Sequence, residues 1–478
     1  MPLVDPDYVD DGALREQDRV DLEDFLSDMD RAELGERGVA FFSGRETEIT
    51  AFRRIVNRLS RGRQGNATIV VEGPPGAGKS ALLAQFQEEI SGLPPTESGQ
   101  REWLPVFLPA NFAEAPKEIA RAIDRAISVR LADRILRGAA QPAPGLAARF
   151  QAAMGPKAGI KNVKEAARKL AGRGGGAFGM SIGPSPQEPI ASLGDAVARR
   201  AEHWSEWQIV LLIDEAQQIS DQRPGDVSGT LSSIHQGGVP APISFCSFGL
   251  PGTWAALEGV NVSRSLGGAD LRVATLDESA ARKAVNRCFE AFEVRNAEAW
   301  QQAIVERSAN WPQHLATYLV SAMAQIRRQS AGKQHLDASA ASLAAAMAIG
   351  DEGRNGYYAR RFERLTRGNG HFQAYAETVV MLFRKSGGQL SWNEIKAALQ
   401  EHDRSVGNDE VNRFTTMAEH SGLMRRDPST PTYQMPIPSF AGYLLNEPLP
   451  EVAEPDYLAD EDPCRDGEGG LSAQDIEL

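Results

Sequence analysis

Residues 67–80 read Ala-Thr-Ile-Val-Val-Glu-Gly-Pro-Pro-Gly-Ala-Gly-Lys-Ser, and this stretch decides the fold. The β-branched run at 67–72 is typical of a buried strand, which the following glycine and prolines end. Gly73 to Ser80 matches the pattern GxxxxGK[ST], which requires a strand before it and a helix after it. Apolar residues after Lys79 supply that helix. The sequence therefore predicts a phosphate-binding loop (P-loop) between a strand and a helix.

The residue types in this loop fit phosphate chemistry. Glycines let successive backbone N–H groups converge on phosphate oxygens without Cβ clashes. The N-terminus of the following helix adds the positive end of its dipole. We expect Lys79 to reach the β- and γ-phosphates and Ser80 to bind Mg²⁺. The candidate nucleotide-binding residues of the loop are Gly73, Pro74, Pro75, Gly76, Ala77, Gly78, Lys79, Ser80 and Ala81.

A second motif, Ile-Val-Leu-Leu-Ile-Asp-Glu-Ala, occupies residues 209–216. Its continuous apolar run is typical of a central parallel strand. Asp214 at the strand tip is predicted to help hold Mg²⁺, and Glu215 is predicted to be the catalytic base that polarises an attacking water. Further strands are expected at 103–108 and 243–248. Strands that alternate with helices in this way predict an α/β core with a parallel sheet.

With these motifs the chain resembles bacterial AAA+ ATPases of the Orc/Cdc6-like and STAND-related group. The stretch from Phe42 to Glu46 (Phe-Ser-Gly-Arg-Glu) is similar to a box that precedes the P-loop in that group and lies near the adenine and ribose. Arg45 is therefore either a nucleotide-side residue or a structural one. The resemblance covers about residues 39–446. It implies ATP and Mg²⁺ as ligands, and an α/β P-loop NTPase core followed by an all-α lid and a winged helix.

The same resemblance implies three further site residues. Ser247 would contact the γ-phosphate or the lytic water from the end of the sensor-1 strand. Arg264 stands where the group places an arginine finger, which reaches the nucleotide of a neighbouring subunit. Gln313 stands where many AAA+ proteins carry a sensor-2 arginine. A neutral amide cannot supply charge there, so we expect either slow hydrolysis or a nucleotide-locked switch. We expect the neighbouring Trp311 and His314 to pack or cap.

From about residue 277 the pattern becomes helical, with helices expected at 277–293, 296–308, 312–328 and 336–347. The predicted domains are an acidic N-terminal tail at 1–38, an ATPase core at 39–275 with a basic insert at 134–187, a helical lid at 276–350, a winged helix at 351–446 and an acidic disordered tail at 447–478.

The winged helix is expected to contain helices at 372–383, 392–399 and 410–421, a hairpin over 422–435 and a closing strand at 435–440. If this unit reads DNA, the phosphate contacts are Arg413, Arg425 and Arg426. Winged helices also dock proteins, so the sequence leaves a DNA partner and a protein partner open.

The formal net charge of −13 is unevenly distributed. Residues 1–37 carry −9 and residues 447–478 carry −10, which leaves about +6 on the body of the chain. The segment 134–187 holds nine Lys/Arg against one acid, which makes it either a solvated surface loop or an element that faces DNA or another partner.

The first thirty residues lack the pattern of a secretory signal, and no apolar run is long enough to span a membrane. The three scattered cysteines, Cys246, Cys288 and Cys464, fit a reducing cytosol and form no zinc motif. We therefore expect a cytoplasmic protein with no membrane partner.

The sequence thus predicts an ATP-binding and ATP-hydrolysing AAA+ switch that self-assembles or captures a partner in response to ATP. Two alternatives stay open. One is an ATP-dependent DNA-binding regulator of the initiator or transposition-helper kind. The other is a nucleotide-gated scaffold of a bacterial defence system that does not hydrolyse ATP.

Overall fold

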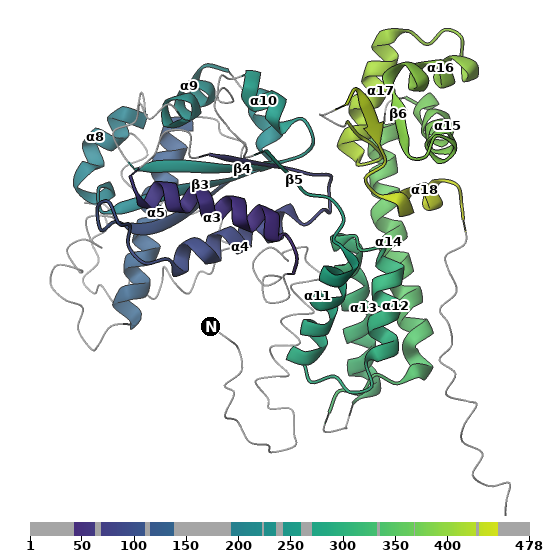
Figure 1. Ribbon diagram of the computed structural model, residues 1–478, viewed down its shortest axis with the longest axis horizontal. Coiled ribbons are helices and arrows are strands. Elements are labelled where there is room, and N and C mark those ends of the chain that lie inside the picture. Colours follow the sequence, from purple (N-terminus) through teal and green to yellow (C-terminus); the bar gives the residue numbers. More distant parts are fainter. Residues whose placement is uncertain are drawn as a thin grey trace, which may run out of the picture.

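The computed structural model describes residues 43–62, 68–109, 115–137, 193–221, 224–235, 242–259, 270–331, 335–367, 369–426 and 430–447. A five-stranded sheet in the order β2-β3-β4-β1-β5 forms the centre of the N-terminal part (Figure 1). All of its neighbouring strands pair in parallel, which confirms the predicted α/β core. The strands are β1 (Ile69–Glu72), β2 (Glu102–Pro109), β3 (Trp207–Asp214), β4 (Ile243–Gly249) and β5 (Asp270–Arg272).

Helices cover both faces of this sheet. Apolar side chains of α3 (Glu46–Ser60) and α4 (Lys79–Gly92) pack on one face. The other face is covered by α5, α8, α9 and α10 together with the short 3-10 helix η2. Their bounds are α5 (Ala115–Arg137), α8 (Leu193–Trp204), η2 (Ala216–Asp221), α9 (Pro224–His235) and α10 (Thr253–Gly259). Because the sheet is buried on both sides, β1 and β3 are apolar along almost their whole length.

The sheet order determines where the two motifs meet. β4 lies between β1 and β3, and the three strands run in the same direction. The loops that follow β1 and β3 therefore leave the sheet at the same carboxyl edge, where ligands bind in sheets of this kind. Residues 134–137 of the predicted basic insert belong to α5, and the rest of the insert lies outside the described residues, as do both acidic tails from 1–38 and 448–478.

A helical bundle follows the core. It contains α11 (Glu278–Ala291), α12 (Glu298–Ser308), α13 (Pro312–Gln329) and the first turns of α14 (Leu343–Thr366), packed around one apolar cluster. The start of α11 is capped by Asp277, whose side chain accepts a hydrogen bond from Ala280 N at 2.7 Å. These helices match the first three that the sequence predicts for the lid.

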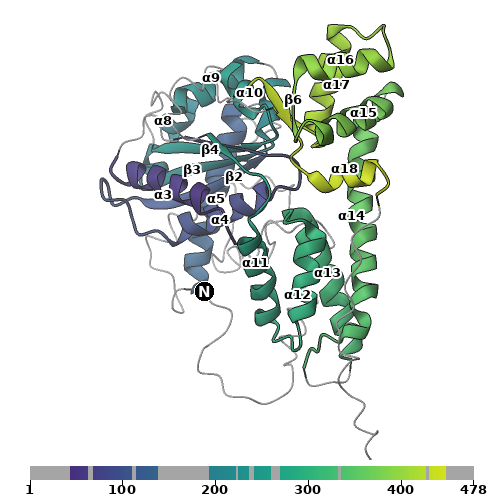
Figure 2. The same cartoon turned by 45° about the vertical axis from the view of Figure 1, so that its right-hand side comes forward.

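The fourth predicted helix is wrong in its bounds. Instead of ending at 347, α14 runs to Thr366, and the predicted domain boundary at 350/351 falls inside it (Figure 1, Figure 2). Gly350 and Gly353 are residues of low helix propensity, but the packing of α14 requires a residue without a Cβ at both positions. A Cβ on Gly350 would lie 2.2 Å from Tyr318 Cδ1, and one on Gly353 would lie 2.7 Å from Thr317 Cγ2. Close contact between α13 and α14 therefore offsets the low helix propensity of glycine.

The C-terminal unit, residues 371–447, combines helices with a three-stranded antiparallel sheet in the order β6-β8-β7. Three of its helices and its hairpin agree with the predicted elements, whereas the strand β6 between the first two helices was not predicted. The elements are α15 (His371–Lys385), β6 (Gln389–Ser391), α16 (Trp392–His402), α17 (Asn408–Ser421), β7 (Arg425–Arg426), β8 (Thr432–Gln434) and α18 (Pro438–Leu444). The closing strand predicted at 435–440 is wrong, because α18 begins there with a proline in its first turn, a position that proline favours.

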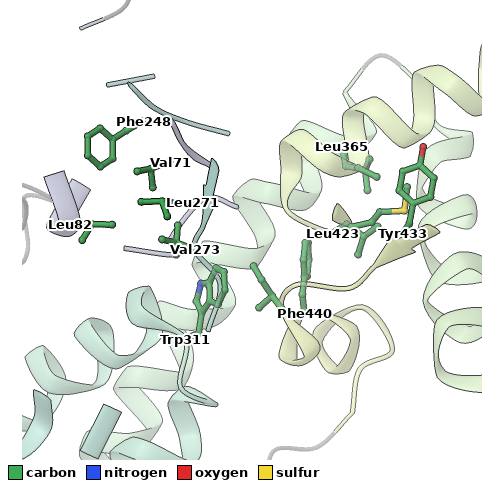
Figure 3. Packing of buried hydrophobic residues seen from close by; sticks show 14 of the residues in the cluster. Val71, Leu82, Phe248, Leu271, Val273, Trp311, Leu365, Leu423, Tyr433 and Phe440 are labelled. Carbon is green, nitrogen blue, oxygen red and sulfur yellow. The ribbon is translucent and has the colours of Figure 1, made fainter. Parts of the chain in front are cut away.

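One apolar cluster joins the ATPase core to the C-terminal unit. It extends from sheet residues such as Val71 and Val273 through Trp311 and Tyr357 to residues such as Phe440. Figure 3 shows Trp311 next to Val273, between the sheet residues of the cluster and the C-terminal residue Phe440. The two parts therefore share a core at the carboxyl edge of the sheet. Within the described ranges, no helix is long and apolar enough to cross a membrane.

Candidate active site

The loop between β1 and α4 has the backbone that a phosphate site needs. Gly76 and Gly78 have φ angles of 82° and 84°, in the left-handed region that favours glycine. No side chain of the described residues caps the start of α4. The N–H groups of its first turn can therefore point at an anion, and the helix dipole favours negative charge there. This geometry fits the phosphates of a nucleotide.

Lys79 lies inside the loop, at the first position of α4. Its Nζ donates hydrogen bonds to Gly73 O at 2.8 Å and to Pro74 O at 3.0 Å. Burial lowers the pKa of Lys79 to about 8, while the charges of Glu215 and Asp214 act in the opposite direction. The ammonium group thus lies within electrostatic reach of both acids, so the fold brings the two sequence motifs together.

Asp214 and Glu215 stand at the end of β3. Asp214 Oδ1 accepts a hydrogen bond from Glu215 N at 2.9 Å, and burial raises the pKa of Asp214. Glu215 is exposed and has a φ of 55°, a conformation that costs energy for a residue with a Cβ and is often found at functional sites. The Ser80 hydroxyl, exposed on α4, and the Asp214 carboxylate are hard oxygen ligands of the kind that Mg²⁺ takes.

Gln217 is a site residue that the sequence analysis missed. Its Nε2 donates to the Glu215 carboxylate, and its Oε1 accepts from Leu250 N at 2.9 Å, at the end of β4. The amide therefore fixes Glu215 relative to the central strand. An amide two residues after an acid is too common a pattern to reveal such a bridge from sequence.

Arg45 contacts the loop from outside. Its guanidinium donates to Ala77 O at 2.9 Å and also to Ala274 O, in the segment that leads from β5 to the bundle. Burial lowers the pKa of Arg45, and the nearby Glu48 carboxylate acts against this. The side chain thus holds the backbone of the P-loop against the start of the lid, which favours the structural one of its two expected roles.

The start of α13 covers the loop from the lid side. Gln313 N donates to Gly76 O at 3.1 Å, and a Cβ on Gly76 would lie 2.9 Å from Trp311 Nε1. His314 is fully buried, and burial lowers its pKa to about 3, so the imidazole is neutral. It packs edge-on against Tyr358, with ring centres 5.0 Å apart. These contacts fit the packing role expected for Trp311 and His314, and this end of α13 offers the loop only neutral groups.

One predicted site residue lies inside the sheet, before this edge. Ser247 is fully buried in β4, in register with Val70 and Ile213, two residues before the strand ends at Gly249. Its hydroxyl lies within the sheet and has no hydrogen-bond partner among the described residues. The prediction could not resolve the register, which sets the depth of each side chain in the sheet. Arg264 lies outside the described residues.

α14 adds two residues that the sequence analysis did not single out. Tyr357 donates its hydroxyl proton to Pro75 O at 2.5 Å, across 282 positions of sequence. The Arg361 guanidinium carbon lies 5.1 Å from the centre of the Tyr357 ring. No local pattern signals a contact over such a separation, and only the fold reveals it.

The parallel sheet, the glycine loop at its edge and the acidic pair beside the loop lysine define a P-loop ATPase fold. Residues 42–232 match the family described as "AAA ATPase domain". This match and the fold together confirm the resemblance to AAA+ ATPases.

Solved structures with similar folds come from several organisms. The Walker-type ATPase of Pyrococcus abyssi has a TM-score of 0.51 at 13% identity, over 84% of this chain and 96% of that one. The ORC2 protein of Aeropyrum pernix has a TM-score of 0.48 at 10% identity, over 85% and 96%. The ORC1 protein of the same organism, solved with DNA, has a TM-score of 0.39 at 14% identity, over 85% and 93%. No curated protein matches the sequence.

The lowered pKa of Lys79 predicts that ATP binding depends on pH. The charges of the phosphates would raise this pKa above about 8, so the affinity gained from a protonated Lys79 is fully present below about pH 8 and is lost as the pH rises. We expect the affinity for ATP to fall about tenfold between about pH 7 and about pH 9. Calorimetry in buffers of different ionisation enthalpy should also show proton uptake on binding at the higher pH. Equal affinity at both pH values with no proton uptake would contradict this prediction.

Proposed function

We propose that this chain is an ATP-hydrolysing AAA+ switch, in which the nucleotide at the P-loop controls the position of the C-terminal unit. Self-assembly or the capture of a partner would follow from that movement, and hydrolysis would reset it. ATP and Mg²⁺ are the proposed ligands, and the cytoplasm is the proposed compartment.

The observation that carries the proposal is the contact of three separate elements with P-loop residues 74–76. Gln313 of α13 donates its backbone N–H to Gly76 O, and Tyr357 of α14 donates to Pro75 O. From the C-terminal unit, Gly422 approaches so closely that a Cβ there would lie 3.2 Å from Pro75 Cδ. A change in the loop backbone on nucleotide binding therefore reaches the lid, α14 and the C-terminal unit directly.

The side chains at this edge suit phosphoryl transfer. Lys79 would bind the phosphates, and Ser80 and Asp214 would hold Mg²⁺, which supplies charge neutralisation when it is bound. Glu215, held by Gln217, would orient and deprotonate the attacking water. Because Gln313 and His314 are neutral, the end of α13 gives the transferred phosphoryl group no charge.

The arginines expected to contact DNA phosphates bear on which partner the switch takes. Arg413, one of the expected phosphate contacts, stacks over the Phe372 ring at 5.9 Å, and Arg425 donates to Gln434 at 3.4 Å. Arg413 is nevertheless exposed, as is Arg426, so these contacts are compatible with a protein partner and with a DNA partner. Duplex DNA, bound through this unit or through the basic insert, is the alternative that the experiment below separates.

Hydrogen exchange measured by mass spectrometry tests the switch. The full chain is compared without nucleotide, with ADP and with a non-hydrolysable ATP analogue, and each sample is also sized by light scattering with and without duplex DNA. We expect the exchange of residues 354–362 and 418–426 to differ between the ADP and triphosphate states. Identical exchange of the C-terminal unit in all three states would refute the proposal, and a triphosphate-dependent complex with DNA would favour the regulator.

A further inference from the structure

α14 directs a half-buried cation toward the candidate active site. Arg361 follows Tyr357 by four residues, so both lie on the same face of the helix. Tyr357 binds Pro75 O of the P-loop with its hydroxyl group, and the Arg361 guanidinium lies over its ring at 5.1 Å. The face of α14 that touches the loop therefore also carries Arg361.

The surrounding charges place Arg361 near both motifs of the site. Burial lowers the pKa of Arg361, and the Glu215 carboxylate acts against this. Burial also lowers the pKa of Lys79, and the charge of Arg361 contributes to the same shift. Arg361 is thus within electrostatic reach of both the proposed base and the loop lysine. Two cations that converge in a partly buried site favour an anion between them.

We propose that Arg361 binds the terminal phosphate of the nucleoside triphosphate and supplies, from α14, the positive charge that Gln313 of the lid lacks. This inference rests on the proposed ATPase function and names the residue that distinguishes the triphosphate from the diphosphate. The terminal phosphate is the one that Glu215 and its water must reach, and Arg361 is within electrostatic reach of Glu215. A guanidinium is suited to this role because its planar array of donors matches phosphate oxygens.

The position of Arg361 links this contact to the switch. α14 is a single helix that starts in the lid bundle, passes the P-loop and leads into the C-terminal unit (Figure 2). A triphosphate held by Arg361 would keep α14 against the loop, and loss of the terminal phosphate would remove that contact while leaving the contacts of Lys79 with the remaining phosphates.

The test compares Arg361→Gln, Arg361→Lys and a control, Arg360→Gln, in the full chain. Arg360 is the adjacent arginine of the same helix and is exposed, so its substitution makes the same chemical change away from the loop. Calorimetry measures the binding of ADP and of a non-hydrolysable ATP analogue. We expect Arg361→Gln to weaken the binding of the triphosphate analogue by about tenfold or more, as for the loss of charge-assisted hydrogen bonds. The binding of ADP should weaken by less than about threefold. Arg361→Lys should fall in between, and Arg360→Gln should match the wild type.

The selectivity for the triphosphate over ADP is the decisive quantity, because general damage to the fold would weaken both nucleotides together. The inference is overturned, and the ATPase proposal stands, if Arg361→Gln binds ADP and the triphosphate as tightly as the wild type does. It is also overturned if Arg361→Gln and Arg361→Lys each lose affinity for the two nucleotides equally. If the wild-type chain binds neither nucleotide, the proposed function itself fails.

Discussion

Replacement of Glu215 by glutamine should reduce ATP turnover by about 10²- to 10⁴-fold, the contribution of a positioned general base. Glutamine keeps the size and hydrogen bonds of the side chain but cannot take a proton from water. Glu215 is exposed and hydrogen-bonded to Gln217, so its substitution creates no buried defect. The affinity for ATP should stay within about threefold, because no phosphate contact is removed. Phosphate release and equilibrium binding measure the two quantities separately.

Glu258→Gln is the matched control, since Glu258 is exposed on α10 and the chemical change is the same. Its turnover should equal that of the wild type. The Glu215 variant should also accumulate in the triphosphate state, so hydrogen exchange in its C-terminal unit after addition of ATP should resemble that of the wild type with the non-hydrolysable analogue. Equal, measurable turnover of Glu215→Gln and wild type would exclude Glu215 as the base. Tight ATP binding with no phosphate release from either protein would instead leave only nucleotide gating without hydrolysis.

The features that could be predicted are those encoded locally. A glycine loop between an apolar strand and a helix, and an apolar strand that ends in Asp214 and Glu215, each occupy a short continuous stretch. Parallel strands share a carboxyl edge, so these two motifs had to meet. The structure brings Lys79 within electrostatic reach of both acids, as expected.

The features that could not be predicted depend on contacts between distant parts of the chain. The length of α14 follows from the fit of Gly350 against Tyr318, which only the packed bundle reveals. The depth of Ser247 follows from its register with Val70. Arg361 reaches the site because α14 passes the loop, although nearly three hundred residues separate the two in sequence. The sequence shows the neutral Gln313 at the lid position where related proteins carry an arginine, whereas the cation that we propose in its place stands on another helix.

Replacement of Lys79 by alanine should abolish measurable turnover and weaken ATP binding by at least about 30-fold. Loss of one partner from a buried charge pair costs about 2–5 kcal/mol, and every 1.4 kcal/mol is about tenfold in affinity. The Nζ of Lys79 lies against the loop backbone, on Gly73 O and Pro74 O, so the phosphates would meet it in place of those carbonyl oxygens. Calorimetry and phosphate release check both effects.

Lys283→Ala, an exposed lysine on α11, is the control and should bind ATP as the wild type does. The Lys79 variant should also lose the dependence of affinity on pH between about pH 7 and about pH 9, because the group that takes up the proton is gone. Unlike Arg361→Gln, it should weaken ADP as well as the triphosphate, since its position inside the loop gives it contacts with the phosphates that both nucleotides share. Retention of wild-type affinity by Lys79→Ala would mean that the loop at 73–80 is not where the nucleotide binds.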